Sequence, residues 1–194
     1  GTLGGALTGN SNVAMGYNAL TANTSGHSNV GVGPSAGSNI TSGHSNVAIG
    51  YNTMYTGTGV TGARNIGIGR ESMRTVQSGE MNVCVGDVSG YALTSGDKNV
   101  GIGSNALAAA TTGDSNVAIG YAALDANTEA DNNVAIGADA LTDSTTGYSN
   151  VAIGHDAGRE ITTGYKSVII GDASGSQGDP QTGWENIVIG WNSG

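Results

Sequence analysis

The stretch Ser-Asn-Val-Ala-Ile-Gly at residues 45–50 decides the fold, because it returns along the whole chain. Identical copies stand at 115–120 and 149–154, and close variants fill the intervals. Successive copies are 17 residues apart, apart from two steps of 19. A period held this tightly is the signature of a repeat protein. It leaves no segment over for a second domain, so we expect residues 1–194 to form one repeat domain.

Each repeat predicts one coil of a β-solenoid. Its Asn-Val-Ala-Ile-Gly run is β-type and closed by glycine, a looser second run follows, and a turn ends in Thr-Ser-Gly or Thr-Thr-Gly. No stretch shows the 3.6-residue apolar period of a helix. The sequence therefore predicts an all-β, parallel β-solenoid (β-roll) of about eleven 17-residue coils, with two short strands in each. At the strand spacing of about 4.8 Å, the coils would form a rod about 50 Å long.

The asparagine that opens each run serves as position 0 of its coil. Stacked one coil apart, identical side-chain amides can hydrogen-bond along the rod, as asparagine ladders do in cross-β stacks. The alternative is that asparagine only suits a tight turn. The predicted structural ladder consists of Asn12, Asn29, Asn46, Asn65, Asn82, Asn99, Asn116, Asn133, Asn150 and Asn186, with Ser167 replacing asparagine in one coil.

The apolar positions of each coil indicate an interior. Positions 1 and 3 are Val, Ile or Met in every copy, share one strand face and are expected to point inward. Positions 8 and 11 compensate in volume: a leucine such as Leu124 is followed by a small or polar residue, whereas Gly37 is followed by Ile40. Close-packed interiors require such volume matching, so we expect a solid core without a ligand cavity.

Position 2 lies on the opposite strand face and is small or apolar in every coil, never charged. If positions 1 and 3 point inward, position 2 points outward and forms an uncharged stripe, which would be adhesive if left exposed. The sequence therefore predicts an oligomer interface at Ala14, Ala48, Cys84, Ala118, Ala135, Ala152, Ile169 and Val188.

The repeated Ser-Asn-Val-Ala-Ile-Gly, followed by Ala-Leu or Ala-Gly and then Thr-Thr-Gly, resembles the head repeats of trimeric autotransporter adhesins. It is closer still to the repeat regions of bacteriophage tail fibres. The resemblance covers essentially the whole chain. It implies a left-handed roll, a homotrimer with three chains side by side, and a role in host-surface attachment, in a virion tail fibre or at a cell surface. It also implies that the chain is a fragment of a longer fibre protein.

Charge and composition exclude several partners. The net charge is −9, and the six basic residues form no stripe, which argues against nucleic-acid binding. No apolar run is long enough to span a bilayer. Cys84 has no partner for an intrachain disulfide.

Few side chains suggest chemistry. His27 and His44 stand one coil apart, as do Asp139 and Asp156, and each pair should lie about 5 Å apart. Without a third ligand or a groove around them, we expect no metal, no cofactor and no catalytic residue. Calcium binding by the acidic turns is left open.

The aromatic residues suggest a contact surface at the strand edges. Amphipathic rings there can stack on a cell-surface glycan or seal the seams between chains, and we favour the seams. The residues concerned are Tyr17, Tyr51, Tyr121, Tyr148, Tyr165, Trp184 and Trp191.

We therefore expect a non-enzymatic shaft or head segment of a trimeric fibre. The alternative is a self-assembling extracellular filament subunit, because Gly1 and Gly194 both fall within a coil and unpaired solenoid ends can stack. Ice binding through a threonine column, and a polysaccharide-degrading tailspike, are weaker alternatives.

Overall fold

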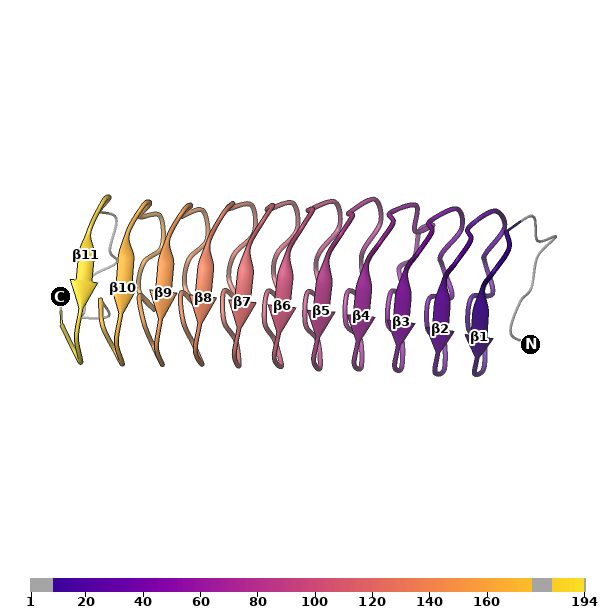
Figure 1. The fold of residues 1–194 in the computed structure, drawn as a ribbon, viewed down its shortest axis with the longest axis horizontal. Helices are drawn as coiled ribbons and strands as arrows, with labels where there is room; N and C mark the ends of the chain where they lie inside the picture. Colours follow the sequence, from indigo (N-terminus) through magenta and orange to yellow (C-terminus); the bar gives the residue numbers. More distant parts are fainter. Residues whose placement is uncertain (1–8, 176–182, 194) are drawn as a thin grey trace.

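The computed structural model describes residues 9–175 and 183–193, and its regular elements are eleven short parallel strands (Figure 1). No helix occurs within these residues. The strands are β1 (Val13–Met15), β2 (Val30–Val32), β3 (Val47–Ile49), β4 (Ile66–Ile68), β5 (Val83–Val85), β6 (Val100–Ile102), β7 (Val117–Ile119), β8 (Val134–Ile136), β9 (Val151–Ile153), β10 (Val168–Ile170) and β11 (Ile187–Ile189). The predicted all-β, parallel solenoid is confirmed.

The strands form one sheet in chain order, β1 to β11, and equivalent residues of successive coils pair directly. Val117 pairs with Val134, and Ala118 pairs with Ala135. The wall opposite the sheet is also held by bonds between coils, as where the Leu124 amide donates to the Ala140 carbonyl at 3.0 Å. Each coil therefore forms its backbone hydrogen bonds with the neighbouring coils. The rest of the coil returns the chain to the sheet, so the parallel strands need no helical crossover.

The prediction of a second strand in each coil is wrong. After the corner glycine the chain runs through turns, and positions 6 and 8 adopt left-handed backbone angles even when they are not glycine, as at Ala122 (φ 49°) and Leu124 (φ 52°). The serine before the anchor asparagine is also left-handed, with φ of 59° at Ser115. Each such residue costs about 1 kcal/mol. The repeated bonds between coils and the buried leucines hold the wall in this shape.

The corner glycine at position 4 has a specific reason. Gly33 has a φ of 124°, and a Cβ there would lie 2.8 Å from the Gly50 carbonyl oxygen of the next coil. Both the angle and the close approach exclude a side chain.

The predicted orientation of the strands is wrong in every coil between the two ends of the rod. Position 2 points into the roll: Ala48, Cys84, Ala118, Ala135 and Ala152 are fully buried within the chain. Ile169 is also buried, and the terminal members Ala14 and Val188 are half-buried. Positions 1 and 3 point outward instead. Because side chains alternate along a strand, this one error exchanges the two faces.

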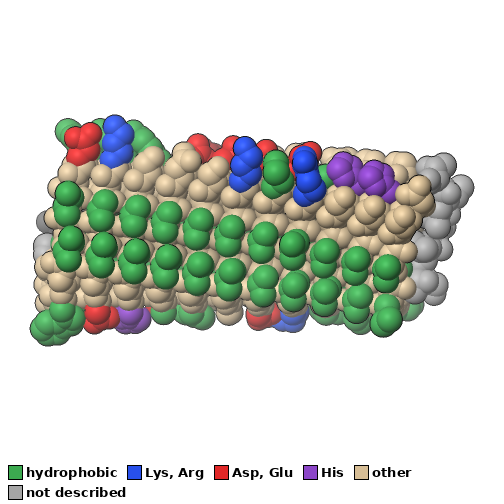
Figure 2. Space-filling model, in the orientation of Figure 1, with side chains coloured by type: hydrophobic (Ala, Val, Ile, Leu, Met, Phe, Trp, Pro, Cys, Tyr) green, Lys and Arg blue, Asp and Glu red, His purple; other side chains and the backbone are tan. Residues whose placement is uncertain are grey.

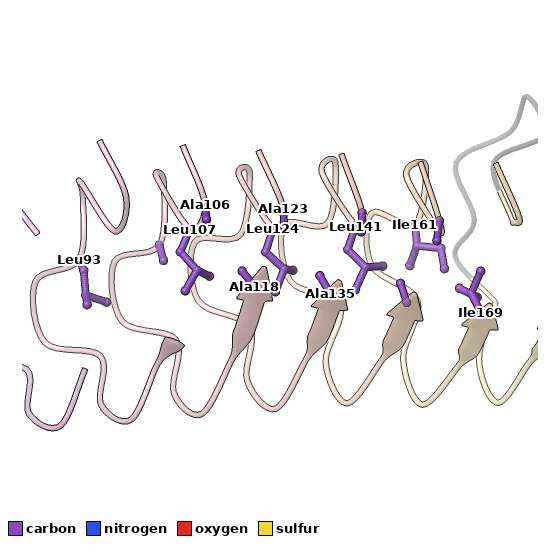
Figure 3. Packing of buried hydrophobic residues seen from close by; sticks show 14 residues of the cluster. Leu93, Ala106, Leu107, Ala118, Ala123, Leu124, Ala135, Leu141, Ile161 and Ile169 are labelled. Carbon is purple, nitrogen blue, oxygen red and sulfur yellow. The ribbon is translucent and has the colours of Figure 1, made fainter. Parts of the chain in front are cut away.

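The thickness of the roll explains the orientation. A Cβ added at position 2 of β2, on Gly31, would lie 2.9 Å from Cγ of Leu20 and 2.9 Å from the Ala36 carbonyl oxygen. The space beneath the strand is thus already filled by the leucine of the preceding coil. Figure 3 shows the same arrangement farther along, with Leu124 and Leu141 reaching toward Ala118 and Ala135. A roll this thin accepts mostly small residues from the sheet.

The predicted volume compensation is confirmed. Leu20 and Ile40 are both fully buried, and a Cβ on the intervening Gly37 would lie 2.8 Å from Leu20 Cδ2 and 2.9 Å from Ile40 Cδ1. The large side chain of each coil therefore occupies space that its neighbour leaves open. The described core contains two continuous clusters of this kind, one around Leu20 to Cys84 and one around Leu93 to Ile169.

The asparagine ladder is present and buried. Asn116 Oδ1 accepts the backbone N–H of Asn133 at 3.0 Å, and Asn116 Nδ2 donates to the Ala130 carbonyl at 2.7 Å. The same pair of bonds recurs from Asn12 to Asn150, and amide-to-amide bonds are added in the middle of the rod, as from Asn116 Nδ2 to Asn99 Oδ1 at 3.1 Å. Asn186, at the end of the ladder, is exposed, and its N–H donates to Ser167 Oγ at 3.3 Å.

Candidate functional site

The most distinctive surface of the chain is the outer face of its sheet, made by the first and third residues of β1 to β11. We call it the valine–isoleucine face, since every member is Val or Ile except Met15. Figure 2 shows its side chains as two unbroken rows along the rod. Mid-rod isoleucines such as Ile102 and Ile136 remain 40% and 36% exposed, and Ile189 near one end is 65% exposed.

The dimensions of this face make it a candidate interaction surface. Ten strand steps of about 4.8 Å and two columns of β-branched side chains make an area about 50 Å long and on the order of 500 Å². The largest apolar patch of an ordinary monomer falls at about 300–600 Å² and is often functional. This face lies in the upper part of that range and carries no charged residue. It is also regular and nearly flat, which suits contact with another regular surface.

The sequence contained a signal for this face that we interpreted in the wrong direction. β-Branched residues are favoured on pleated strands whichever way they point. The informative feature was position 2, which is Ala or Gly in eight of the eleven coils, while positions 8 and 11 carry the larger side chains.

Charged and aromatic side chains border the face on both sides (Figure 2). We call the two positions before the anchor asparagine the leading edge, and the position after the corner glycine the trailing edge. On the leading edge, Arg64 pairs with Glu80 at 2.6 Å and Lys166 with Glu185 at 3.6 Å.

On the trailing edge, Arg70 pairs with Asp87 at 2.8 Å, and His155 Nδ1 lies 3.1 Å from Asp172 Oδ1. The Asp87 carboxylate raises the pKa of Arg70, through its hydrogen bond first and its charge second. All these pairs join neighbouring coils and remain in contact with solvent.

The aromatic residues divide into two groups. Tyr148, Tyr165 and Trp184 stack on the leading edge, with ring centroids 4.9 and 5.8 Å apart and planes within 11°. The faces that meet within this stack cover one another, whereas Trp184 at its end remains 60% exposed. A sugar ring needs an open aromatic face, which weakens the glycan interpretation for Tyr165, the middle ring of the stack.

The second aromatic group lies on the trailing edge and is more open. It consists of Tyr17, Tyr51, Tyr121 and Trp191, which are 52–78% exposed and lie in coils that are not adjacent. These rings remain candidates both for a seam between chains and for contact with a glycan.

The clusters of titratable side chains in residues 9–175 and 183–193 lie at the surface of the roll. His27 and His44 stack at 4.9 Å, as their spacing predicts. Asp139 and Asp156 lie together with His155, which the sequence analysis missed because it belongs to the neighbouring column, and one ligand atom from each lies within 4.8 Å of the others. Asp156 also pairs with Arg159 at 3.4 Å. Surface ion pairs thus engage Asp156 and His155, and the three residues together offer possible ligand atoms for a metal ion.

Two further groups have shifted pKa values, and both shifts arise chiefly from burial. The Cys84 thiol lies in the core, and burial raises its pKa to about 12. The Asp125 carboxyl is half-buried, and burial together with the nearby charge of Asp139 raises its pKa. The Asp125 and Asp139 carboxyls therefore lie close enough to influence each other's charge.

The threonine column does not offer free hydroxyls in an open array. Thr111 Oγ1 donates to the Thr128 carbonyl at 2.8 Å, and Thr94 Oγ1 donates to the Thr111 carbonyl at 2.9 Å. These hydroxyls donate hydrogen bonds to the backbone of the next coil and are not free to bind ice. Among the described coils, the valine–isoleucine face is therefore the better candidate for an extended regular contact surface.

Among the described residues, no helix is long and apolar enough to cross a membrane. Comparison of the chain with protein-family models, with curated proteins and with solved structures finds no match.

Proposed function

We propose that this chain is a structural and adhesive segment of a trimeric fibre, of the kind found in phage tail fibres and surface adhesins. In this role it is a stiff rod that supports attachment to a host surface. The observation that carries the proposal is the uncharged valine–isoleucine face, which runs the length of the described coils without interruption.

Covering that face with another apolar surface would release a large free energy. About 500 Å² of apolar surface corresponds to about 12 kcal/mol of transfer free energy at 25 cal/mol per Å². A straight stripe along a rod is covered by a second copy of the same rod, because the two share one repeat along the axis. Three rods placed with their stripes inward cover all three stripes around a closed axis. This arrangement of three rods also places the charged and aromatic edges at the rim of each interface, and interface rims are usually polar.

The rest of the molecule suits a rod rather than an enzyme or a carrier. The interior is filled by leucine, alanine and asparagine side chains, and each coil is bonded to its neighbours through backbone and asparagine ladders. Such a solenoid resists bending and offers few loops to proteases. The open trailing-edge rings, such as Tyr121 at 57% exposure, provide candidate glycan contacts in an assembled fibre.

Sedimentation velocity and negative-stain electron microscopy of the purified chain test the proposal. We expect a species of three times the chain mass, seen as short rods about 50 Å long. A chain that remains monomeric across the micromolar range would overturn the trimer. Fibres of unlimited length would favour the alternative, a filament subunit that stacks end to end.

A further inference from the structure

We propose that Asp139, His155 and Asp156 bind a divalent ion of the zinc class, at the corners that follow β8 and β9. The sequence offers the two aspartates without a third ligand, and the fold supplies it. One ligand atom from each of the three residues lies within 4.8 Å of the others. The site belongs to a single chain, so it does not rest on the proposed trimer.

The stacking of the coils brings these side chains together. Asp139 and Asp156 stand at position 6 of successive coils, one strand spacing of about 4.8 Å apart. The Asp156 N–H donates to the Ala138 carbonyl at 2.9 Å, which holds the two corners in register. His155 precedes Asp156 and lies on the trailing edge. Two rigid corners, joined by a backbone hydrogen bond, thus carry all three ligands.

The kind of donor atom selects the ion. Calcium and magnesium are held by oxygen ligands, whereas an imidazole nitrogen with carboxylate oxygens suits zinc and its neighbours among the transition metals. The ligand atoms of tetrahedral zinc are about 3.3 Å apart, so the three side chains must close by about 1.5 Å. The His155 side chain is 58% exposed and free to turn, and water can take the fourth position.

Asp172, on the next coil, is placed to orient the histidine. Its Oδ1 lies 3.1 Å from His155 Nδ1, so the ring can donate the Nδ1–H to this carboxylate and keep Nε2 as a ligand. Histidines that bind metal ions usually donate their other ring N–H to a carboxylate or a carbonyl, which fixes the tautomer. The contact of His155 with Asp172 is therefore part of the site and does not compete with it.

The surrounding charge favours a bound cation. Carboxylates at positions 125, 139, 156 and 172 follow one another along this corner of the rod, and within the described coils Arg159 is the one lysine or arginine paired with any of them. The negative charge of Asp139 contributes to the raised pKa of Asp125, after burial. A divalent ion beside Asp139 would offset this excess of negative charge.

The ion pairs already present leave carboxylate oxygens for the ion. Arg159 contacts Asp156 Oδ1 at 3.4 Å, whereas Asp156 Oδ2 lies on the side of His155, 3.4 Å from Nδ1. Asp139 has no lysine, arginine or histidine nitrogen within 4.0 Å among the residues that the structure describes. Exposed ion pairs contribute little to stability, so an ion that draws Asp156 toward it displaces little.

Isothermal titration of the untagged chain with zinc chloride, and separately with calcium chloride, tests the site. We expect one zinc ion per chain, bound roughly a hundredfold more tightly than calcium. Removing a ligand should weaken zinc binding at least about tenfold, and removing the carboxylate behind the histidine should weaken it about tenfold. The variants are His155→Ala, Asp139→Ala, Asp156→Ala and Asp172→Ala.

These variants should fold, because alanine already occupies both coil positions elsewhere. Ala138 stands where His155 and Asp172 stand in their coils, and Ala122 holds the left-handed angle of position 6 with a φ of 49°. Circular dichroism should therefore show the β-signal of the parent chain for each variant, and a change in zinc binding then reports on the site itself.

The matched control is the double variant His27→Asn with His44→Asn, since Asn10 stands at the same coil position. The chain has three histidines, so this control removes the other two imidazoles and should bind zinc as the parent does. Equal zinc binding by the parent and His155→Ala, or loss of binding in the control, would overturn the site. A parent chain that binds no zinc, or binds calcium as tightly as zinc, would overturn it as well.

Discussion

Two neighbouring residues of β8, Ala135 and Ile136, should respond in opposite ways to the same substitution. Ala135 is fully buried in the roll, whereas Ile136 lies on the valine–isoleucine face and is 36% exposed. Glutamate at position 135 would place an unpaired carboxylate among Leu124 and Leu141, within the apolar cluster. Burying such a group costs about 5 kcal/mol or more, a large part of the 5–15 kcal/mol that holds a typical domain together.

Glutamate at position 136 has a different expected effect. The side chain can reach solvent in a single chain, so the coil should lose only about 1 kcal/mol. In the proposed trimer, however, three such carboxylates would gather near one axis, and association should fall by several kcal/mol. We therefore expect Ala135→Glu to lose β-structure and Ile136→Glu to remain folded but monomeric.

Circular dichroism with urea unfolding measures the first effect, and sedimentation velocity measures the second. The controls are Ala135→Gly and Ile136→Val, because both residue types already occur in those columns; both should fold and assemble. The reasoning fails if Ala135→Glu retains the full β-signal and loses only its partners. That result would mean that position 2 faces outward.

Three further outcomes follow from the interior. Asn116→Ala should destabilise the chain by about 2–4 kcal/mol, because it leaves the backbone N–H of Asn133 buried without its partner and leaves the Ala130 carbonyl with only the longer bond from Asn127; a fall in urea midpoint checks it, and an unchanged midpoint would contradict a structural ladder. Gly90→Ala should lower the melting temperature because its Cβ would overlap the Cys84 sulfur at a left-handed φ of 60°, and adding Cys84→Gly should recover part of the loss. Burial raises the Cys84 pKa to about 12 from 9.0, so the folded chain keeps the thiol proton at pH values where the unfolded chain loses it. The contribution of this thiol to the free energy of unfolding therefore falls as the pH rises from 9 to 12. Native protein should accordingly react with a thiol reagent at pH 8 far more slowly than unfolded protein; equal rates would show that the thiol is accessible.

The sequence by itself determined the architecture. Eleven copies of one motif at a nearly constant step leave a parallel stack as the arrangement in which equivalent residues meet, and the structure pairs them in that register. The asparagine ladder could be predicted for the same reason, because a buried amide repeated once per coil meets its own copy. The exchange of volume between positions 8 and 11 was visible as well, since packing at constant density forces it.

Only the tertiary structure decided which face of the strand is inside. A period of two assigns residues to two faces but does not label them, and both faces here are uncharged. The usual preference for burying the larger apolar residues pointed to Val117 and Ile119. The thickness of the roll decided otherwise, because Leu124 already fills the space beneath the sheet and leaves room only for residues such as Ala118.

The second wall and the edges depended on tertiary contacts in the same way. Local preference suggested a second strand, yet bonds from coil to coil hold Leu124 and its equivalents at left-handed angles that such residues rarely adopt alone. The cluster of Asp139, His155 and Asp156 joins two columns whose proximity depends on how the corner turns. A one-dimensional repeat thus determines what stacks along the axis, while the cross-section of the coil determines what lies inside, outside and side by side.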